Sequence, residues 1–193
     1  MQNIENYTKE KRTIDLGKAN VFSILILFPI LLIFGLPFYL IWGESFSIKS
    51  ILDGLVPMDI PIMMLYFFGI TIIGIILHEL IHGIFWAMFT KNGFKSIKFG
   101  VLWKMLTPYC HCTEPLKVKQ YIIGAIAPAV ILGFIPSILA LFNGSLGLLI
   151  FGMFFTMAAA GDFLIINLIR KENKNSLVQD HPTEAGYYIY KKN

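Results

Sequence analysis

The chain contains 193 residues, of which 56% are hydrophobic and only 15% are charged, and its mean hydropathy is +0.68. This composition argues against a soluble globular protein and predicts a single transmembrane domain over residues 1–193. The formal charge of +4 does not indicate a nucleic acid as a partner, because the basic residues flank hydrophobic runs and form no stripe.

Four long hydrophobic runs predict transmembrane helices, at residues 19–42, 61–89, 121–141 and 145–169. Each run can cross a hydrocarbon core about 30 Å thick, because a helix rises about 1.5 Å per residue. Pro128 and Pro136 predict kinks in the third run. Residues 143–145 predict a tight turn, so the third and fourth helices should be antiparallel neighbours. The expected fold class is an all-α membrane protein with four transmembrane helices.

The 16 lysines and arginines alternate along the chain in a way that predicts its orientation. Four precede the first run, one lies at 43–60, six lie at 90–120, none lies at 143–145, and five follow residue 169. Since basic residues concentrate on the cytoplasmic side, we expect a multi-pass protein of the plasma membrane with both termini inside. Residues 90–120 then form a cytoplasmic interfacial segment, and residues 170–193 form a cytoplasmic tail.

Residues 92–112 differ in character from the four runs. Lysines there are mixed with aromatic and β-branched residues, and Gly100 interrupts the pattern. Short pieces of this kind, separated by breakers, predict a β-hairpin at the cytoplasmic membrane interface, in the segment that connects the second and third helices. An irregular amphipathic loop is the alternative, and the sequence favours neither.

The sequence His78-Glu79-Leu80-Ile81-His82 lies within the second hydrophobic run. On a helix the two histidines are one turn apart on the same face, so their imidazoles can provide two ligands for Zn²⁺. Because such groups are costly in hydrocarbon, they are expected to face the bundle interior, a partner or a metal. Glu79 is then free to act as general base on metal-activated water.

A zinc hydrolase site needs a third protein ligand and leaves a fourth position for water. Asp162 is the only charged residue in the fourth run. Counted from the cytoplasmic helix ends, His82 and His78 lie about 13 and 20 Å deep and Asp162 about 12 Å deep. These overlapping depths favour Asp162 as the third ligand, and the alternative is a helix cap or a partner for a lysine.

Cys110, His111 and Cys112 form a competing group of possible zinc ligands. Adjacent ligands do not converge easily on one ion, and the chain has no Cys-x-x-Cys sequence, so we favour a packing role near the membrane surface. His181 precedes a proline in the polar tail, where a role in a turn or a helix start is expected.

These motifs together resemble the "putative zincin peptidase" family of small bacterial membrane proteins, formerly a domain of unknown function. The resemblance rests on His-Glu-Leu-Ile-His-Gly, Tyr-Cys-His-Cys-Thr-Glu-Pro-Leu, Ala-Gly-Asp and Asp-His-Pro-Thr-Glu-Ala-Gly-Tyr-Tyr-Ile-Tyr, over about residues 65–190. More distantly, the layout is similar to site-2 proteases, which are intramembrane zinc peptidases. The resemblance implies that His78, His82 and Asp162 bind Zn²⁺ and that Glu79 is the base. It also implies that residues 92–112 resemble the β-element beside that active site, where an extended substrate can add as a strand.

Two functional hypotheses follow. The first is an intramembrane zinc metallopeptidase that cleaves membrane or juxtamembrane peptide segments, with a membrane protein or peptide as its partner. The second is a non-catalytic, zinc-stabilised membrane scaffold. A small metal or ion transporter ranks last, because the first and third runs offer almost no polar residues at the membrane midplane.

Overall fold

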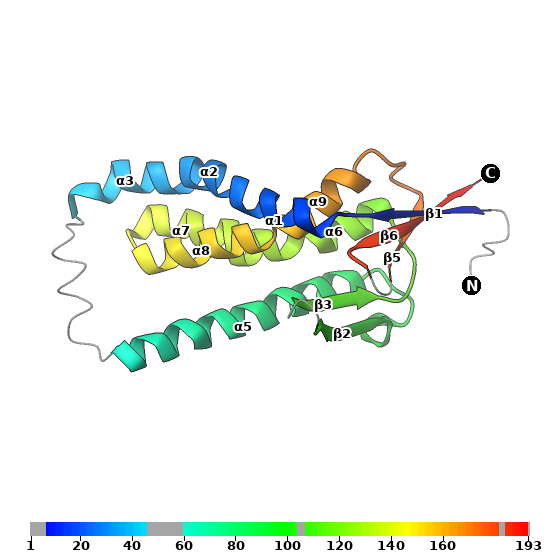
Figure 1. The fold of residues 1–193 in the computed structure, drawn as a ribbon, viewed down its shortest axis with the longest axis horizontal. Coiled ribbons are helices and arrows are strands. Elements are labelled where there is room, and N and C mark those ends of the chain that lie inside the picture. The colour runs from blue at the N-terminus through cyan, green and yellow to red at the C-terminus, as the bar shows by residue number, and fades with distance from the viewer. Residues whose placement is uncertain (1–6, 46–59, 104–106, 182–183, 193) are drawn as a thin grey trace.

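The computed structural model describes residues 7–45, 60–103, 107–181 and 184–192. Within these ranges a helical bundle fills one end of the molecule, and two small antiparallel sheets lie at the other end beside both chain ends (Figure 1). The helices are α1 (Leu16–Leu25), α2 (Leu27–Ile30), α3 (Leu36–Trp42), α5 (Ile60–Ala87), α6 (Val118–Pro128), α7 (Ile135–Asn143), α8 (Leu146–Ala158) and α9 (Ala160–Ile169). The strands are β1 (Tyr7–Thr13), β2 (Ile97–Leu102), β3 (Thr107–Cys112), β4 (Leu116–Lys117), β5 (Leu177–Asp180) and β6 (Gly186–Lys192).

Three helical stretches are long and apolar enough to cross a membrane: Val21–Ser45, Ile60–Ala87 and Val118–Asn143. The pair α8 and α9 makes a fourth if it counts as one span, although the two helices meet at an angle of 44°. The four runs found in the sequence are therefore helical, but the fourth is broken near Ala159. The turn at 143–145 is as expected, with Gly144 in the left-handed conformation at φ 71° and α7 packed against α8.

The two prolines of the third run do not break it. Between Pro128 and Pro136 the chain forms the π-helical turn Ala129–Phe134, and helix continues on both sides as one 26-residue stretch. A proline lacks the N–H of the normal ladder and crowds the preceding turn, and a wider turn relieves both problems. The expected kinks thus take the form of a π-helical turn within a continuous span.

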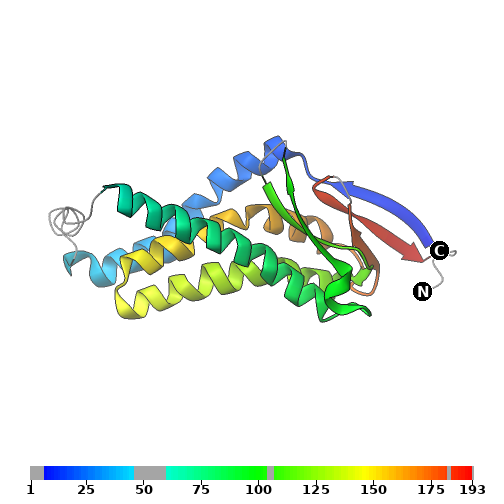
Figure 2. The same cartoon turned by 90° about the horizontal axis from the view of Figure 1, so that it is seen from below.

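Apolar side chains cover much of the outer surface of the bundle. On α5, Leu65 is 71% exposed and Tyr66 is 61% exposed, and Ile72 and Ile73 are exposed as well. A contiguous apolar surface of this kind is unfavourable in water and suits contact with lipid tails. Seen from below, α5 runs along one face of the bundle towards the two sheets (Figure 2).

The hairpin expected within residues 92–112 is present. Strands β2 and β3 pair antiparallel, from Ile97 opposite Cys112 to Leu102 opposite Thr107. The apolar face of the hairpin rests on α5, where the side chains of Ile97 and Phe99 lie against Gly83. The structure therefore favours the hairpin over an irregular loop.

The chain is mostly helical, as expected, but the all-α class is wrong for the segment after residue 169, which was expected to be a cytoplasmic tail. Residues of that tail form β5 and β6, which join β1 and β4 in a four-stranded sheet of order β1-β6-β5-β4. Strand β1 begins at Tyr7, opposite Lys192, so the two ends of the chain pair with each other. The strands are short, and β1 and β4 gain their partners from distant parts of the chain, which explains why local patterning did not reveal the sheet.

A buried apolar cluster connects this sheet to the bundle. It includes Trp86 of α5, Tyr121 of α6, Ile169 of α9 and Tyr187 of β6. Since these residues come from α5, α6, α9 and β6, the cluster fixes the position of the histidine-bearing part of α5.

Candidate metal centre

Helix α5 carries His78 and His82 on one face. The helix is unbroken for 28 residues. The two histidines, four residues apart, are therefore about one helical turn apart, and their ring centroids lie 4.9 Å from each other. Both side chains are buried, His82 more completely than His78. The pair is thus held away from the exposed apolar side of α5, as expected for groups that are costly in hydrocarbon.

Asp162 reaches the two histidines from α9. It lies in the first turn of that helix, immediately after the bend at Ala159. Its Oδ2 is 3.2 Å from Nε2 of His78, and its Oδ1 is 3.3 Å from Nε2 of His82. Ala159 and Ala160 are fully or almost fully buried, which permits α9 to approach closely. The structure therefore brings together the three residues that the sequence suggested as ligands.

These three residues fit a zinc ion. Two imidazole nitrogens and one carboxylate oxygen are ordinary zinc donors, and tetrahedral coordination with bonds of about 2.0–2.1 Å separates its donors by about 3.3 Å. The observed separations of 3.2 and 3.3 Å match that value. Among the described residues, His78, His82 and Asp162 form the group able to hold a metal ion, with one donor atom of each within 4.8 Å of the others.

The second nitrogen of His82 has a defined partner. Nδ1 of His82 donates to the carbonyl oxygen of Gly124, at 2.8 Å, in the tautomer that leaves Nε2 as a ligand atom. A Cβ at Gly124 would overlap the indole of Trp86, so only glycine allows α6 to lie this close to α5. In the described part of the chain, Nδ1 of His78 is buried without a hydrogen-bond partner.

An aromatic stack supports His82 from the other side. The indole of Trp86 stacks on the His82 ring with centroids 5.1 Å apart, and the Tyr121 ring stacks on Trp86 at the same distance. Nε1 of Trp86 donates to the backbone carbonyl of Tyr121 at 3.1 Å. The Tyr121 hydroxyl in turn donates to Oδ1 of Asp180, at the end of β5.

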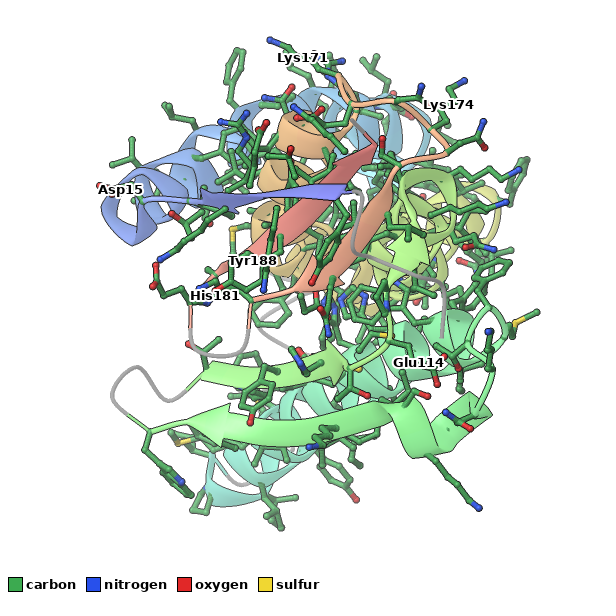
Figure 3. All side chains as sticks on the ribbon, turned by 90° about the vertical axis from the view of Figure 1, so that its right-hand side faces the viewer. Asp15, Glu114, Lys171, Lys174, His181 and Tyr188 are labelled. Carbon is green, nitrogen blue, oxygen red and sulfur yellow. The ribbon has the colours of Figure 1, made fainter. Side chains whose placement is uncertain are left out.

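Glu79 faces the same cavity as the three candidate ligands. The cavity has a volume of about 300 Å³, and its walls come from α5, α9, β3 and the segments around β5 and β6. The backbone N–H of Cys110 in β3 donates to the Glu79 carboxylate. Viewed from the sheet end, the hairpin lies below the larger sheet, and Glu114 marks the end of β3 (Figure 3). The hairpin is therefore one wall of the candidate site.

The Cys110-His111-Cys112 segment does not join the metal group. Successive side chains on a strand point to opposite faces, so His111 lies on the face opposite the two cysteines. Burial raises the pKa of Cys112 to about 12, and burial, followed by the charge of Glu79, also raises the pKa of Cys110. Both thiols are therefore protonated near neutral pH, and neither belongs to the group of donor atoms that converges within 4.8 Å.

The remaining candidate, His181, has the turn role that the sequence suggested. Its Nδ1 accepts a hydrogen bond from the backbone N–H of Glu184 at 3.0 Å. Sequence reasoning missed two residues of the cavity wall, Asp180 and Tyr121. The sequence indicated them only weakly, because a tyrosine at a helix start and an aspartate before an aromatic strand occur in many proteins for purely structural reasons.

The fold and the site together define a class of protein: a mostly helical protein whose longest helices are apolar enough to cross a membrane, with a His-Glu-x-x-His helix and an aspartate that converges on its two histidines. The chain belongs to the family described as "Putative zincin peptidase", whose model matches residues 71–177, more than half of the chain. This membership suggests a zinc metallopeptidase. No curated protein and no solved structure matches the chain.

Proposed function

We propose that the protein is an intramembrane zinc metallopeptidase. His78, His82 and Asp162 hold the zinc ion, and Glu79 is the general base. The observation that carries this proposal is the convergence of the three donor atoms within 4.8 Å on the wall of a cavity that Glu79 also lines. A Zn²⁺ ion at such a site polarises a peptide carbonyl and makes water a stronger nucleophile near neutral pH.

Glu79 moves the proton in the proposed reaction. As water attacks the carbonyl carbon, the Glu79 carboxylate accepts a proton from it, and Glu79 then gives that proton to the nitrogen of the departing peptide as the C–N bond breaks. The hydrogen bond from the Cys110 N–H fixes the orientation of the carboxylate. The position of Glu79 next to His78 on the helix keeps it beside the metal without making it a ligand.

The outer edge of β3 supports binding of an extended peptide. The backbone N–H of Thr113 donates to the carbonyl of Ser96. In the antiparallel ladder, the backbone N–H and C=O groups of Cys112 and Cys110 therefore point away from β2. The N–H of Cys112 indeed donates to Asp180. Because the N–H groups of Cys112 and Cys110 already donate to Asp180 and Glu79, a substrate segment would pair along this edge through the outward carbonyl groups of β3, with its peptide bonds beside Glu79.

A second, apolar cavity supports substrates taken from the membrane. It has a volume of about 450 Å³ and lies between α5 and the apolar face of the hairpin. Glu79, Pro108 and Tyr109 line both cavities, so the two adjoin at the proposed base. An apolar side chain next to the scissile bond would fit there, and membrane segments are rich in such side chains.

The proposal includes four membrane spans in the plasma membrane, with both termini in the cytoplasm. The alternation of lysines and arginines supports this orientation, and it places the two sheets and the cavity on the cytoplasmic side, where water is available. Reporter fusions after residues 52, 105, 144 and 185 should read out, in, out and in. A cytoplasmic signal at residue 52 would contradict the orientation.

Glu79→Gln tests the proposed catalysis, because glutamine keeps the shape of the side chain but cannot accept the proton. The variant should retain zinc and lose cleavage by at least about 100-fold. The measurement is metal content of the purified protein, combined with proteomic comparison of membrane-protein fragments in wild-type and variant cells. A scaffold would keep both its zinc and its cellular phenotype, so an unchanged fragment pattern would favour that alternative.

A further inference from the structure

A histidine and an aspartate that the proposed mechanism does not use also line the cavity. Asp180 ends β5 and is buried, and His111 is the next-to-last residue of β3. Both belong to the wall of the cavity that contains His78, Glu79 and Asp162.

Asp180 is held rigidly at both carboxylate oxygens. The Tyr121 hydroxyl donates to Oδ1, and the backbone N–H of Cys112 donates to Oδ2 at 2.8 Å. Burial raises the pKa of Asp180, while these two donors and the nearby His111 oppose that effect. The two hydrogen bonds leave the carboxylate little freedom to turn, so its position relative to β3 is well defined.

His111 lies next to this anchored carboxylate. Its Nδ1 is 3.9 Å from Oδ2 of Asp180, while Cys110 and Cys112 occupy the opposite face of the strand. With Nδ1 on the side of Asp180, the other ring nitrogen, Nε2, can serve a group in the cavity. His181 also lines the cavity, but its Nδ1 is engaged by the Glu184 N–H.

We propose that His111 is a further catalytic residue that donates a hydrogen bond to the substrate, with Asp180 as its positioning residue. The proposal rests on the peptidase function proposed above. When water attacks a peptide carbonyl, the oxygen gains negative charge, and a fixed N–H donor stabilises that charge more than it stabilises the neutral carbonyl. An imidazole oriented by a carboxylate is suited to this role.

The proposed site extends beyond the part of the chain that the family model covers. The family model ends at residue 177, whereas Asp180 comes three residues later, in the strand that pairs with β6. The sheet formed by the chain ends would thus contribute directly to the reaction by placing Asp180 behind His111.

The test compares two ligands on zinc-loaded, full-length protein: a phosphinic peptide with apolar side chains, which mimics the charged transition state, and the peptide of the same sequence. His111→Ala should weaken binding of the phosphinic peptide by about 100-fold and leave peptide binding and zinc content unchanged. Lys98→Gln is the matched control, because Lys98 is the exposed cross-strand partner of His111, and it should change neither affinity.

Asp180→Asn should weaken binding of the phosphinic peptide by about tenfold, and the double variant should bind no more weakly than His111→Ala alone, because both changes remove one interaction. Equal affinities for the phosphinic peptide in wild type and His111→Ala would overturn the proposal. Wild-type protein that holds zinc but binds the phosphinic peptide no better than the peptide would contradict the peptidase function itself. Those two failures are distinguishable, because only the second appears in the unmodified protein.

Discussion

Two groups of possible zinc ligands contribute residues to one cavity, but only one group brings its donor atoms together. The helix-borne group, His78 and His82, turns both imidazoles to the same side, where Asp162 meets them at 3.2 and 3.3 Å. The strand-borne group, Cys110, His111 and Cys112, sends its members to opposite faces. Three adjacent donors are closer in sequence than two donors four residues apart, yet only the second arrangement converges.

The difference teaches that ligand spacing has meaning only together with secondary structure. A helix returns to the same face after nearly four residues, and a strand returns after two. Adjacent residues on a strand therefore serve different surfaces: here the cysteines pack inward, and His111 lies near Asp180 at 3.9 Å. The following predictions test this contrast.

The largest effect is expected for Asp162→Asn, which removes the carboxylate charge but keeps the shape. Zinc affinity should fall by more than about 100-fold, because loss of a direct ligand costs more than loss of its supporting contacts. Competition with a chelator on purified protein measures this change. Full zinc occupancy at wild-type affinity would show that Asp162 is only a packing residue and that the helix-borne group lacks its third member.

Gly124→Ala probes why the helix-borne group is held so precisely in place. The added methyl group would overlap the indole of Trp86, which would disturb the stack on His82 and its bond to the Gly124 carbonyl. Zinc affinity should fall about 10- to 100-fold, as for other contacts that orient a metal ligand. Gly147→Ala on α8 is the control, because a Cβ there meets nothing within 4 Å; equal losses in both variants would contradict the explanation.

Glu114→Gln tests how the strand-borne group is anchored. Glu114 follows β3 and accepts hydrogen bonds from the Ser96 hydroxyl and the backbone N–H groups of Lys91 and Asn92. These bonds, that from Ser96 first, lower its pKa to about 2. The variant should melt about 2–5 °C below wild type near neutral pH.

The pH dependence follows from the sign of the Glu114 shift. Because its pKa is lower in the folded protein than the ordinary value of about 4.3, the carboxylate stabilises the fold above that value. This contribution is lost as the pH falls towards about 2. The melting difference between wild type and Glu114→Gln should therefore shrink over that range. A difference that does not change with pH would show that shape, and not charge, matters at this position.

The smallest effect on zinc is expected for the combined change of Cys110→Ser and Cys112→Ser. Both thiols have raised pKa values and lie outside the His78, His82 and Asp162 group, so metal content should stay at one zinc per chain. The fold should be somewhat less stable, because a serine hydroxyl replaces the buried thiol of Cys112. Loss of the metal in this variant would reverse the comparison between the two groups.

Local sequence was sufficient for features that depend on neighbours along the chain. The hydrophobic runs became helices because each can satisfy its own backbone and present apolar side chains outward. The four-residue spacing of His78 and His82 needed nothing beyond the geometry of α5. The hairpin was one of two expected outcomes, and its two strands lie close together in the sequence.

Tertiary structure alone decided the features that join distant parts of the chain. Asp162 lies 84 residues after His78, and depth in the membrane made it a candidate, but only the bend at Ala159 and the small residues beside it bring it to the histidines. The pairing of β1 with β6 joins residues 7–13 to residues 186–192, and no local pattern specifies such a pairing. Asp180 reaches His111 only because that sheet packs beside the hairpin. Contacts of this kind depend on how whole elements pack together, and so they are not encoded in any short segment of the sequence.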